Sequence, residues 1–312
     1  MDKSNIQFPY IHLVIQLECT KEGNLPENKT SMIRGVIGRI FKKNVCHDFQ
    51  LSCRECKYIN SCVYPAMFEA PEQSVNLLQR GRSVPHPYIL TCNNKEKEYQ
   101  EGDQLHFELL LLGGQAEIFT TYLYHTFDKL EHYDFGKGKV KFLVKSVRQH
   151  GVGQGIEIYN AESIRRPVLQ QFTPQHKEFS KMIIQFKTPL RMLRKGKVLR
   201  NFSVEAFLWQ CQHRLNNLCV LHGGNESGYV TKQELPIIPE DSVRILYETW
   251  VETIRYSTRQ NQSIALNGLS VAVELDKTEE LMEWLPILQF GETFHIGKAT
   301  TFGLGEYEIW YK

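Results

Sequence analysis

The chain has 312 residues, of which 42% are hydrophobic and 11% aromatic, and its formal net charge is only +2 at pH 7. This composition is typical of a folded globular protein and excludes a disordered chain. No run reaches the roughly 18 apolar residues that a membrane span requires, and the N-terminus lacks the apolar core of a signal peptide. We therefore expect a cytoplasmic protein with two domains of about 150 residues each.

The first half of the chain predicts the element order strand, helix, strand, strand, helix, strand. Residues 10–18 alternate around β-branched side chains, which is typical of a strand, and residues 31–43 place apolar side chains at helical spacing after a capping Ser31. The remaining elements of this half are expected at 86–91 (strand), 106–113 (strand), about 115–131 (helix) and 139–147 (strand).

Four of the eight cysteines form a cluster between the first helix and the second strand. Cys46, Cys53, Cys56 and Cys62 have six, two and five residues between them. A C-x-x-C turn can present two thiolates to one ion, and two more complete a tetrahedral shell. We predict a structural zinc ion here, with an iron–sulfur cluster as the alternative that spacing cannot distinguish.

The second half repeats the same order of elements. We expect a strand at 181–190, a helix at 203–223 that ends at glycine, a short helix near 241–250, strands at 255–260 and 263–275, a helix at 277–291 and a final strand. Residues 163–175 contain two prolines and are interpreted as a linker. The predicted fold class is α+β, with tandem ferredoxin-like (RRM-like) βαββαβ domains, each with an antiparallel sheet, at 1–165 and 176–312.

The last nineteen residues contain a glycine-rich turn before the final strand. Gly297, Gly303 and Gly305, with Lys298 after the first of them, can expose backbone N–H groups and a cation to phosphate oxygens. A tight hairpin that needs positive φ explains one or two of these glycines equally well. No Walker loop is present, because no G-K-[ST] precedes a helix.

At this point the sequence resembles the CRISPR-associated pre-crRNA processing endoribonucleases of the RAMP superfamily. The resemblance rests on FKTPLR (186–191), RYSTRQ (255–260), LNGLSVAVEL (266–275) and the C-terminal H-I-G-KATTF-G-L-G, in this order. The block MIRGVIGRIF followed by the cysteine cluster is similar to members with a cysteine-bearing N-terminal domain. His295 occupies the position where the family often has the first glycine of its loop.

The resemblance implies cleavage of CRISPR repeat RNA by the 2′-OH upstream of the scissile phosphate, without a metal ion, leaving a 2′,3′-cyclic phosphate. Such a reaction needs a general base and a general acid, and histidine suits both near pH 7. His47 lies in the region where the family usually has its acid or base, and His295 beside the glycine loop is the alternative. A site without histidine also remains open.

Positive charge is clustered in 137–148, at Arg165 and Arg166, and in 191–200, which indicates a polyanion partner. Ordinary solvated side chains are the competing interpretation. Besides Gly297, Lys298, Gly303 and Gly305, the candidate RNA-binding residues are Arg194, Lys195, Lys197, Arg200, Tyr256 and Arg259. The expected partners are CRISPR repeat RNA and subunits of a CRISPR effector complex.

Two other functional classes remain open. A catalytically inactive RNA-binding RAMP subunit would share the ferredoxin-like core and the glycine loop. A metal-dependent nuclease is less well supported, because the sequence contains no D-x-D motif or paired carboxylate cluster.

Overall fold

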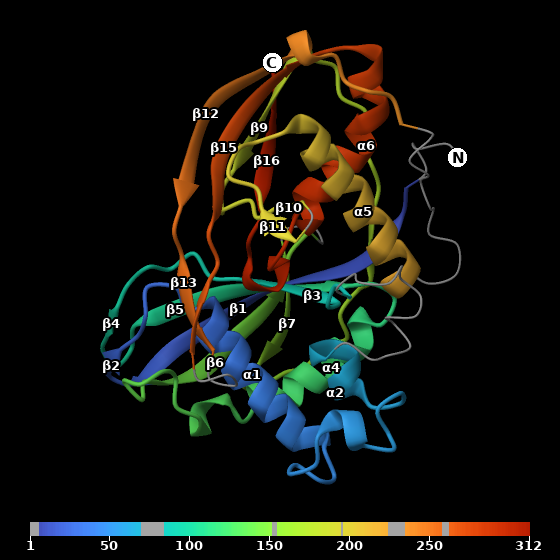
Figure 1. Cartoon of the computed structure of the whole chain (residues 1–312). Coiled ribbons are helices and arrows are strands. Elements are labelled where there is room, and N and C mark those ends of the chain that lie inside the picture. The colour runs from blue at the N-terminus through green and yellow to red at the C-terminus, as the bar shows by residue number, and fades with distance from the viewer. Residues whose placement is uncertain (1–5, 70–83, 152–154, 195, 224–234, 258–261) are drawn as a thin grey trace. The chain divides into compact units, whose positions relative to one another are not determined.

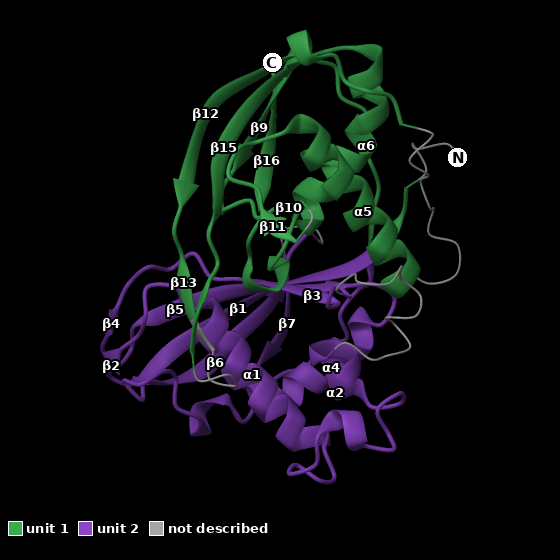
Figure 2. Ribbon diagram, in the orientation of Figure 1, with its two compact units in different colours: residues 1–8, 171–312 green, residues 9–170 purple. Residues whose placement is uncertain are grey.

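The computed structural model describes residues 6–69, 84–151, 155–194, 196–223, 235–257 and 262–312 (Figure 1). The chain divides into two compact units, which are coloured separately in Figure 2. Unit 2 consists of residues 9–170, and unit 1 consists of residues 1–8 together with 171–312. The boundary at 170/171 falls within the proline-containing segment 163–175.

Unit 2 has the βαββαβ order that the sequence predicts. Its main elements are β1 (Phe8–Lys21), α1 (Thr30–Val45), β3 (Tyr88–Thr91), β5 (Gln104–Leu112), α4 (Ala116–Phe127), β6 (Lys141–Gln149) and β7 (Ile156–Asn160). The antiparallel sheet has the order β3-β5-β1-β6-β7, so the first strand lies between the third and fourth strands of the motif. Shorter elements are β2 (Gly23–Asn24), α2 (Val63–Phe68), β4 (Glu98–Tyr99) and β8 (Gln170–Phe172).

The core of unit 2 follows from two periodicities. Along β1, Ile11, Leu13 and Ile15 are fully buried, because every second side chain of a strand points to the same face. Along α1, Ile33 and Ile37 are buried at helical spacing. These side chains belong to one hydrophobic cluster between the sheet and its helices. The opposite face of the sheet carries both polar and apolar side chains, such as His12 and the Leu110 that lies opposite it in the register.

Unit 1 repeats the arrangement. Its elements are β9 (Lys181–Phe186), β10 (Leu193–Arg194), β11 (Lys197–Val198), α5 (Val204–His222), β12 (Val243–Val251), β13 (Ile254–Ser257), β14 (Gln262–Ala265), β15 (Gly268–Asp276), α6 (Glu279–Phe294) and β16 (Tyr307–Tyr311). The antiparallel sheet has the order β12-β15-β9-β16, which is again the ferredoxin-like order. Each unit therefore has the predicted fold class.

Both long helices of unit 1 begin at capping residues that are recognisable in the sequence. The Ser203 hydroxyl accepts a hydrogen bond from the Ala206 N–H at 3.2 Å, and the Thr278 hydroxyl accepts one from the Leu281 N–H at 3.1 Å. These hydroxyls satisfy N–H groups that have no partner within the first turn. The aromatic ring of Phe8 extends the core, with its centroid 5.1 Å from that of Phe294.

The helix predicted near 241–250 is wrong, because this segment forms the edge strand β12. Its β-branched and aromatic side chains suit an extended backbone, and it pairs antiparallel with β15 from Val243 opposite Leu275 to Val251 opposite Gly268. Beyond β12, the strands β13 and β14 form a second paired segment. The strand expected at 263–275 is interrupted at Leu266, whose N–H donates to the carbonyl of Thr253. Pairing with neighbouring strands, rather than the local sequence pattern, determines the secondary structure of this region.

Within the described residues, none of the helices combines the length and apolar character that crossing a membrane demands.

Candidate nucleic-acid interface

The glycine-rich loop of unit 1 connects α6 to β16 and is held against the segment that follows β9. The Lys298 N–H donates to the Arg191 carbonyl at 2.8 Å, and the Gly305 N–H donates to the Pro189 carbonyl at 3.1 Å. The Thr188 hydroxyl donates to the Gly303 carbonyl at 2.7 Å. The loop is therefore a defined structure that is anchored along residues 188–191.

Contacts within the chain require two of the glycines. Gly297 has φ +93° and Gly305 has φ +74°, conformations that side chains with a Cβ rarely adopt. A Cβ at Gly297 would lie 2.6 Å from the carbonyl oxygen of Arg191, and a Cβ at Gly305 would collide with the carbonyl of Ile296. At these two positions, carbonyl groups of the protein itself leave no room for a Cβ. The glycines are therefore explained without a close approach of RNA to the backbone.

His295 lies at the end of α6, with φ +54° and ψ 153°. A positive φ is unusual for a residue other than glycine, so the backbone keeps a glycine-like conformation where the resembled family often has glycine. The residue is only 7% exposed. Its burial indicates that the imidazole supports the loop.

A buried arginine lies directly behind this loop. The Nε and Nη2 atoms of Arg214, on α5, both donate to the Phe294 carbonyl at the C-terminal end of α6, at 3.1 and 3.0 Å. Burial lowers the pKa of Arg214 to about 9, which still leaves it charged at neutral pH. A cation at a helix C-terminus also compensates the helix dipole. The sequence pattern did not single out Arg214, because an arginine in an amphipathic helix is usually solvated.

Two further cations lie in or beside the loop. Burial lowers the pKa of Lys298, and the nearby charge of Arg214 lowers it further. The guanidinium carbon of Arg255, on β13, lies 4.3 Å from the centroid of the Phe302 ring. Positive charge is therefore gathered at this end of unit 1, as the binding of an RNA phosphate would require.

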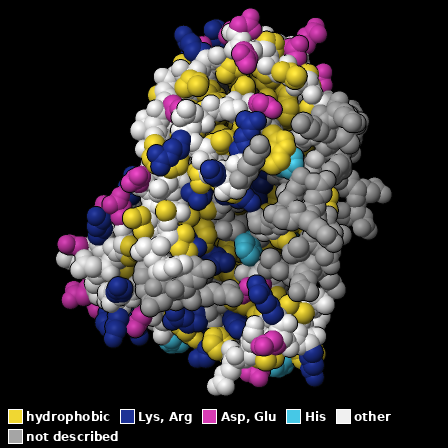
Figure 3. All heavy atoms as spheres, in the orientation of Figure 1, with side chains coloured by type: hydrophobic (Ala, Val, Ile, Leu, Met, Phe, Trp, Pro, Cys, Tyr) yellow, Lys and Arg dark blue, Asp and Glu magenta, His cyan; other side chains and the backbone are white. Residues whose placement is uncertain are grey.

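The basic segment after β9 forms the hairpin β10–β11. Arg194 and Lys197 are exposed and lie opposite each other in this hairpin. Figure 3 shows Lys and Arg side chains gathered over β10 and β11. Arg200 is also exposed, and its guanidinium carbon lies 5.0 Å from the centroid of the Trp250 ring. Lys195 lies outside the described residues.

The candidate residues in RYSTRQ are only partly described. Tyr256 lies on β13, where it pairs with Ser263 of β14, and its side chain is not among those described. Arg259 lies outside the described residues.

The four clustered cysteines of unit 2 are free thiols and all half-buried. Burial raises the pKa of Cys53, and the charges of Glu69, Cys46 and Cys62 raise it further, whereas Lys42 lowers it. The thiols of Cys46, Cys53 and Cys62 are therefore near enough to one another to influence the charge of Cys53. In the part of the chain that the structure describes, however, no group of three or more His, Cys, Asp or Glu side chains is arranged to hold a metal ion. The zinc ion at these four cysteines stays a prediction.

His47 lies two residues after the end of α1 and is exposed, with its ring centroid 6.2 Å from that of Tyr58. His47 belongs to unit 2 and His295 belongs to unit 1. The structure thus gives the two predicted histidines different surroundings, one accessible and one buried. Their chemical roles stay predictions.

Comparisons with known proteins cover both units. Residues 8–174 match a family model described as an N-terminal domain (AF_1859_N), and residues 184–307 match the model of the CRISPR-associated endoribonuclease Cas6. No curated protein matches the chain.

Among solved structures, a chain of a partial Cas6-RT-Cas1--Cas2 complex is 14% identical, with a TM-score of 0.56 over 99% of this chain. The present chain spans only 47% of that longer one. Two Cas6 product complexes match with TM-scores of 0.55 and 0.50 at 12% and 17% identity, covering 96% and 97% of this chain and 100% and 99% of theirs. At these identities the likeness concerns the fold.

Proposed function

The chain belongs to the CRISPR-associated Cas6 proteins of RAMP type, and we propose that it is an endoribonuclease that cuts CRISPR repeat precursor RNA into crRNA. The observation that carries this proposal is the match of residues 184–307 to the Cas6 endoribonuclease model, since this segment contains the glycine loop and its cations. Phosphate oxygens would bind next to Lys298, with Arg214 adding positive potential from behind.

The proposed reaction is an attack of the 2′-OH on the adjacent phosphate, without a metal ion. A base removes the 2′ proton, the 2′ oxygen bonds to phosphorus, and the bond to the 5′ oxygen breaks as an acid protonates that oxygen. The products are a 2′,3′-cyclic phosphate and a 5′-OH. Each proton-transfer partner contributes about 10²–10⁴ to the rate, and cations stabilise the crowded phosphorane.

A labelled repeat RNA incubated with the purified protein in EDTA tests this proposal. Cleavage at one position, with a product end that resists phosphatase until acid opens the cyclic phosphate, is the expected result. Tight binding with the RNA left intact would instead support the inactive RNA-binding subunit. Cleavage that needs added Mg²⁺ would contradict the metal-independent reaction.

The proton-transfer roles of His47 and His295 are tested separately by variants chosen to fit the backbone conformation of each residue. His47→Ala removes an exposed side chain. His295→Gly removes the imidazole and still permits the positive φ, whereas His295→Ala keeps the strained backbone. If His295 transfers a proton, both of its variants should slow single-turnover cleavage at least about a hundredfold with RNA affinity retained. A normal rate in His295→Gly with a lowered thermal midpoint in His295→Ala would assign His295 a supporting role.

We retain a structural zinc ion at Cys46, Cys53, Cys56 and Cys62 as a proposal. It is supported by the cysteine spacing and by the electrostatic proximity of three of these thiols. Elemental analysis should find about one zinc per chain, and Cys53→Ser should lose the ion together with thermal stability. Cys92→Ser, a change at a half-buried cysteine outside the cluster, is the control. Purified protein that contains neither zinc nor iron would contradict the proposal. Protein that contains iron and sulfide would show that the same four cysteines bind an iron–sulfur cluster in place of zinc.

A further inference from the structure

A cluster of ionisable side chains lies on the face of the unit 2 sheet that is opposite its hydrophobic cluster, and it includes none of the residues that the sequence singled out. On β1, the fully buried Ile11 and Leu13 point into the core, so His12 between them points to the opposite face. In the register with β5, Val14 lies opposite Glu108, which puts Glu108 on the same face as His12. His150, directly after β6, donates its backbone N–H to the His12 carbonyl at 2.9 Å.

The side chains of these three residues are in contact or nearly so. The Nε2 atom of His12 donates to the Oε2 atom of Glu108 at 2.7 Å. The rings of His12 and His150 have centroids 5.0 Å apart and an interplanar angle of 53°. The side chains of His12 and Glu108 are 25% and 43% exposed, so a ligand can reach them.

The surrounding charges favour an ionised Glu108. The hydrogen bond from His12 lowers the pKa of Glu108, burial raises it, and the charges of His12, His150 and His106 lower it, with a net result below the ordinary value. The sheet register also places Tyr10 on β1, His106 on β5 and Arg148 on β6 on this face. The carboxylates Glu18 of β1 and Glu157 of β7, which lies opposite Arg148, are on it as well. Two imidazoles and a carboxylate form the centre of the cluster.

This arrangement fits proton transfer. With its Nε2 proton donated to the carboxylate, His12 keeps the lone pair of Nδ1 as a base, and Glu108 stabilises the imidazolium that forms when Nδ1 takes a proton. A second imidazole about 5 Å away can be the acid in the same step. The cluster differs from an ordinary surface pair such as His176 and Glu178, which are 2.9 Å apart, because no second histidine ring within the described residues contacts that pair.

We propose that His12, Glu108 and His150 form the proton-transfer site for RNA cleavage, which rests on the proposed endoribonuclease function. His12 Nδ1 takes the proton of the 2′-OH as the 2′ oxygen bonds to phosphorus. The protonated His150 gives its proton to the 5′ oxygen as the P–O5′ bond breaks. One proton is taken up and one is released, so charge and atoms balance and no oxidant or reductant is needed. Glu108 is a positioning residue for His12.

The test uses the full-length protein and a labelled repeat RNA in single-turnover reactions across pH 5 to 9. His12→Ala and His150→Ala should each lower the cleavage rate at least about a hundredfold while RNA affinity and the thermal midpoint change little. Glu108→Gln keeps the shape of the side chain, and it should lower the rate and shift the pH at which the rate is half-maximal. Added imidazole should restore part of the rate of His12→Ala.

His176→Ala and Glu178→Gln are the matched controls, because they break an exposed His–Glu pair in unit 1 and should leave the rate and its pH profile unchanged. Normal cleavage in both His12→Ala and His150→Ala would overturn the inference and leave the endoribonuclease function intact. A loss of RNA affinity without a change in the rate of bound RNA would make the cluster a binding site and also overturn it. No cleavage by the unmodified protein would overturn the proposed function, and the inference with it.

Discussion

At the scale of single residues, the glycine loop shows positions where the fold itself, rather than a bound ligand, requires a residue without a Cβ. Gly305 combines a positive φ with a collision between any added Cβ and the Ile296 carbonyl. Two other glycines separate these effects. Gly102 has φ +90° with open space around it, and Gly35, in α1, has neither a positive φ nor a neighbour within 4 Å of an added Cβ.

These glycines predict a ranking of alanine variants. Gly305→Ala should lower the free energy of unfolding by about 2 kcal/mol or more, because backbone strain and a collision add. Gly102→Ala should cost about 1 kcal/mol from the strained φ alone, and Gly35→Ala should be neutral or stabilising by up to about 1 kcal/mol, because alanine favours a helix. Urea unfolding of the three variants measures this order. Equal destabilisation by Gly305→Ala and Gly102→Ala would show that the loop relieves the collision by moving.

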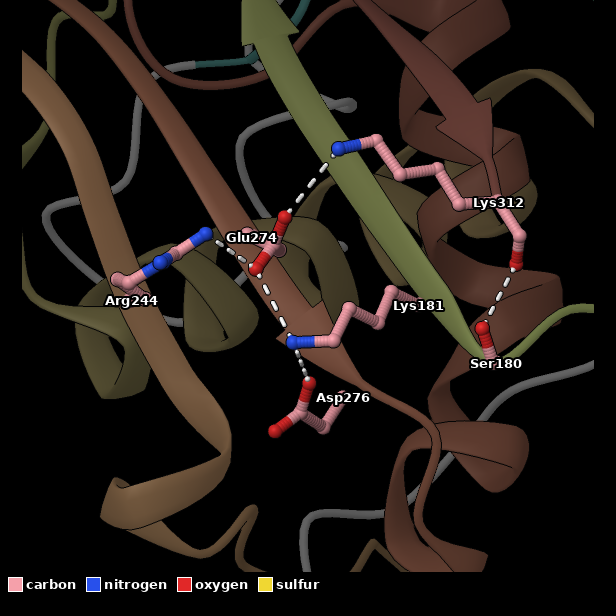
Figure 4. Close-up of polar contacts among 6 residues, drawn as sticks. All are labelled: Ser180, Lys181, Arg244, Glu274, Asp276 and Lys312. Atoms are coloured by element: carbon pink, nitrogen blue, oxygen red, sulfur yellow. Dashed lines mark hydrogen bonds and ion pairs between the residues drawn. The ribbon is translucent and has the colours of Figure 1, made fainter.

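At the scale of elements, one carboxylate on β15 interacts with cations from the other three strands of the unit 1 sheet, or from the residue directly after them. Glu274, on β15, accepts hydrogen bonds from Arg244 of β12 at 2.7 Å and from Lys181 of β9 at 3.3 Å. The Nζ atom of Lys312, directly after β16, lies 3.4 Å from its other oxygen. Figure 4 shows these side chains converging on Glu274, with Asp276 beside Lys181. Because three cations surround it, Glu274 is paired although it is only 4% exposed.

This network predicts a stability that depends on pH in the acid range. Burial raises the pKa of Glu274, but Lys181, Arg244 and Lys312 lower it by more, so its pKa in the folded protein is below the ordinary 4.5. The stabilisation is therefore complete above pH 4.5 and is lost as pH falls through the folded-state pKa. Glu274→Gln should have a lower thermal midpoint than the unmodified protein at pH 7, and the difference should shrink as the pH is lowered from about 4.5 to about 2.

Glu162→Gln is the control for this experiment, since Glu162 lies exposed in a turn and its carboxylate has no cation partner among the described ion pairs. A difference between Glu274→Gln and the unmodified protein that stays constant throughout the acid range would mean that the charge of Glu274 does not carry the effect.

At the scale of the whole molecule, a net charge of +2 is too small to attract RNA by itself, so the attraction must be local. The exposed cations Arg194, Lys197 and Arg200 lie in one short segment after β9. Other lysines of unit 1 are paired with carboxylates, such as Lys187 with Glu308 at 2.8 Å.

This distribution predicts which lysines and arginines set the salt dependence of RNA binding. Replacing Arg194, Lys197 and Arg200 with alanine should weaken binding and reduce the slope of log affinity against log salt by about 2, since each lost contact to single-stranded RNA contributes about 0.7. Replacing the ion-paired Lys187 and Lys277 should change the slope little. Filter binding between about 50 and about 300 mM salt measures both slopes. An unchanged slope in the triple variant would identify the segment as ordinary solvated surface.

Outside the segment of β12, the sequence by itself determined the order of the main helices and strands, because local sequence signals specify these elements. Alternating apolar residues predicted β1, Ser203 and Thr278 begin helices that they cap, and the repeated strand–helix order predicted two ferredoxin-like units. Local pattern did not predict the edge strand β12, since an edge strand half exposed to solvent lacks a clear apolar alternation and its conformation is decided by pairing with β15.

The tertiary structure alone decided which polar side chains meet. His12 and Glu108 are 96 positions apart, and Arg214 reaches a carbonyl 80 positions away, so no local pattern reveals either contact. Strand register brings the first pair together, and the packing of α5 against the end of α6 creates the second. Sequence spacing specifies which residues are neighbours within one element. Contacts between elements depend instead on strand register and on how the chain closes its long loops. For this physical reason the glycine loop was predicted from the sequence, while the cluster around His12 was not.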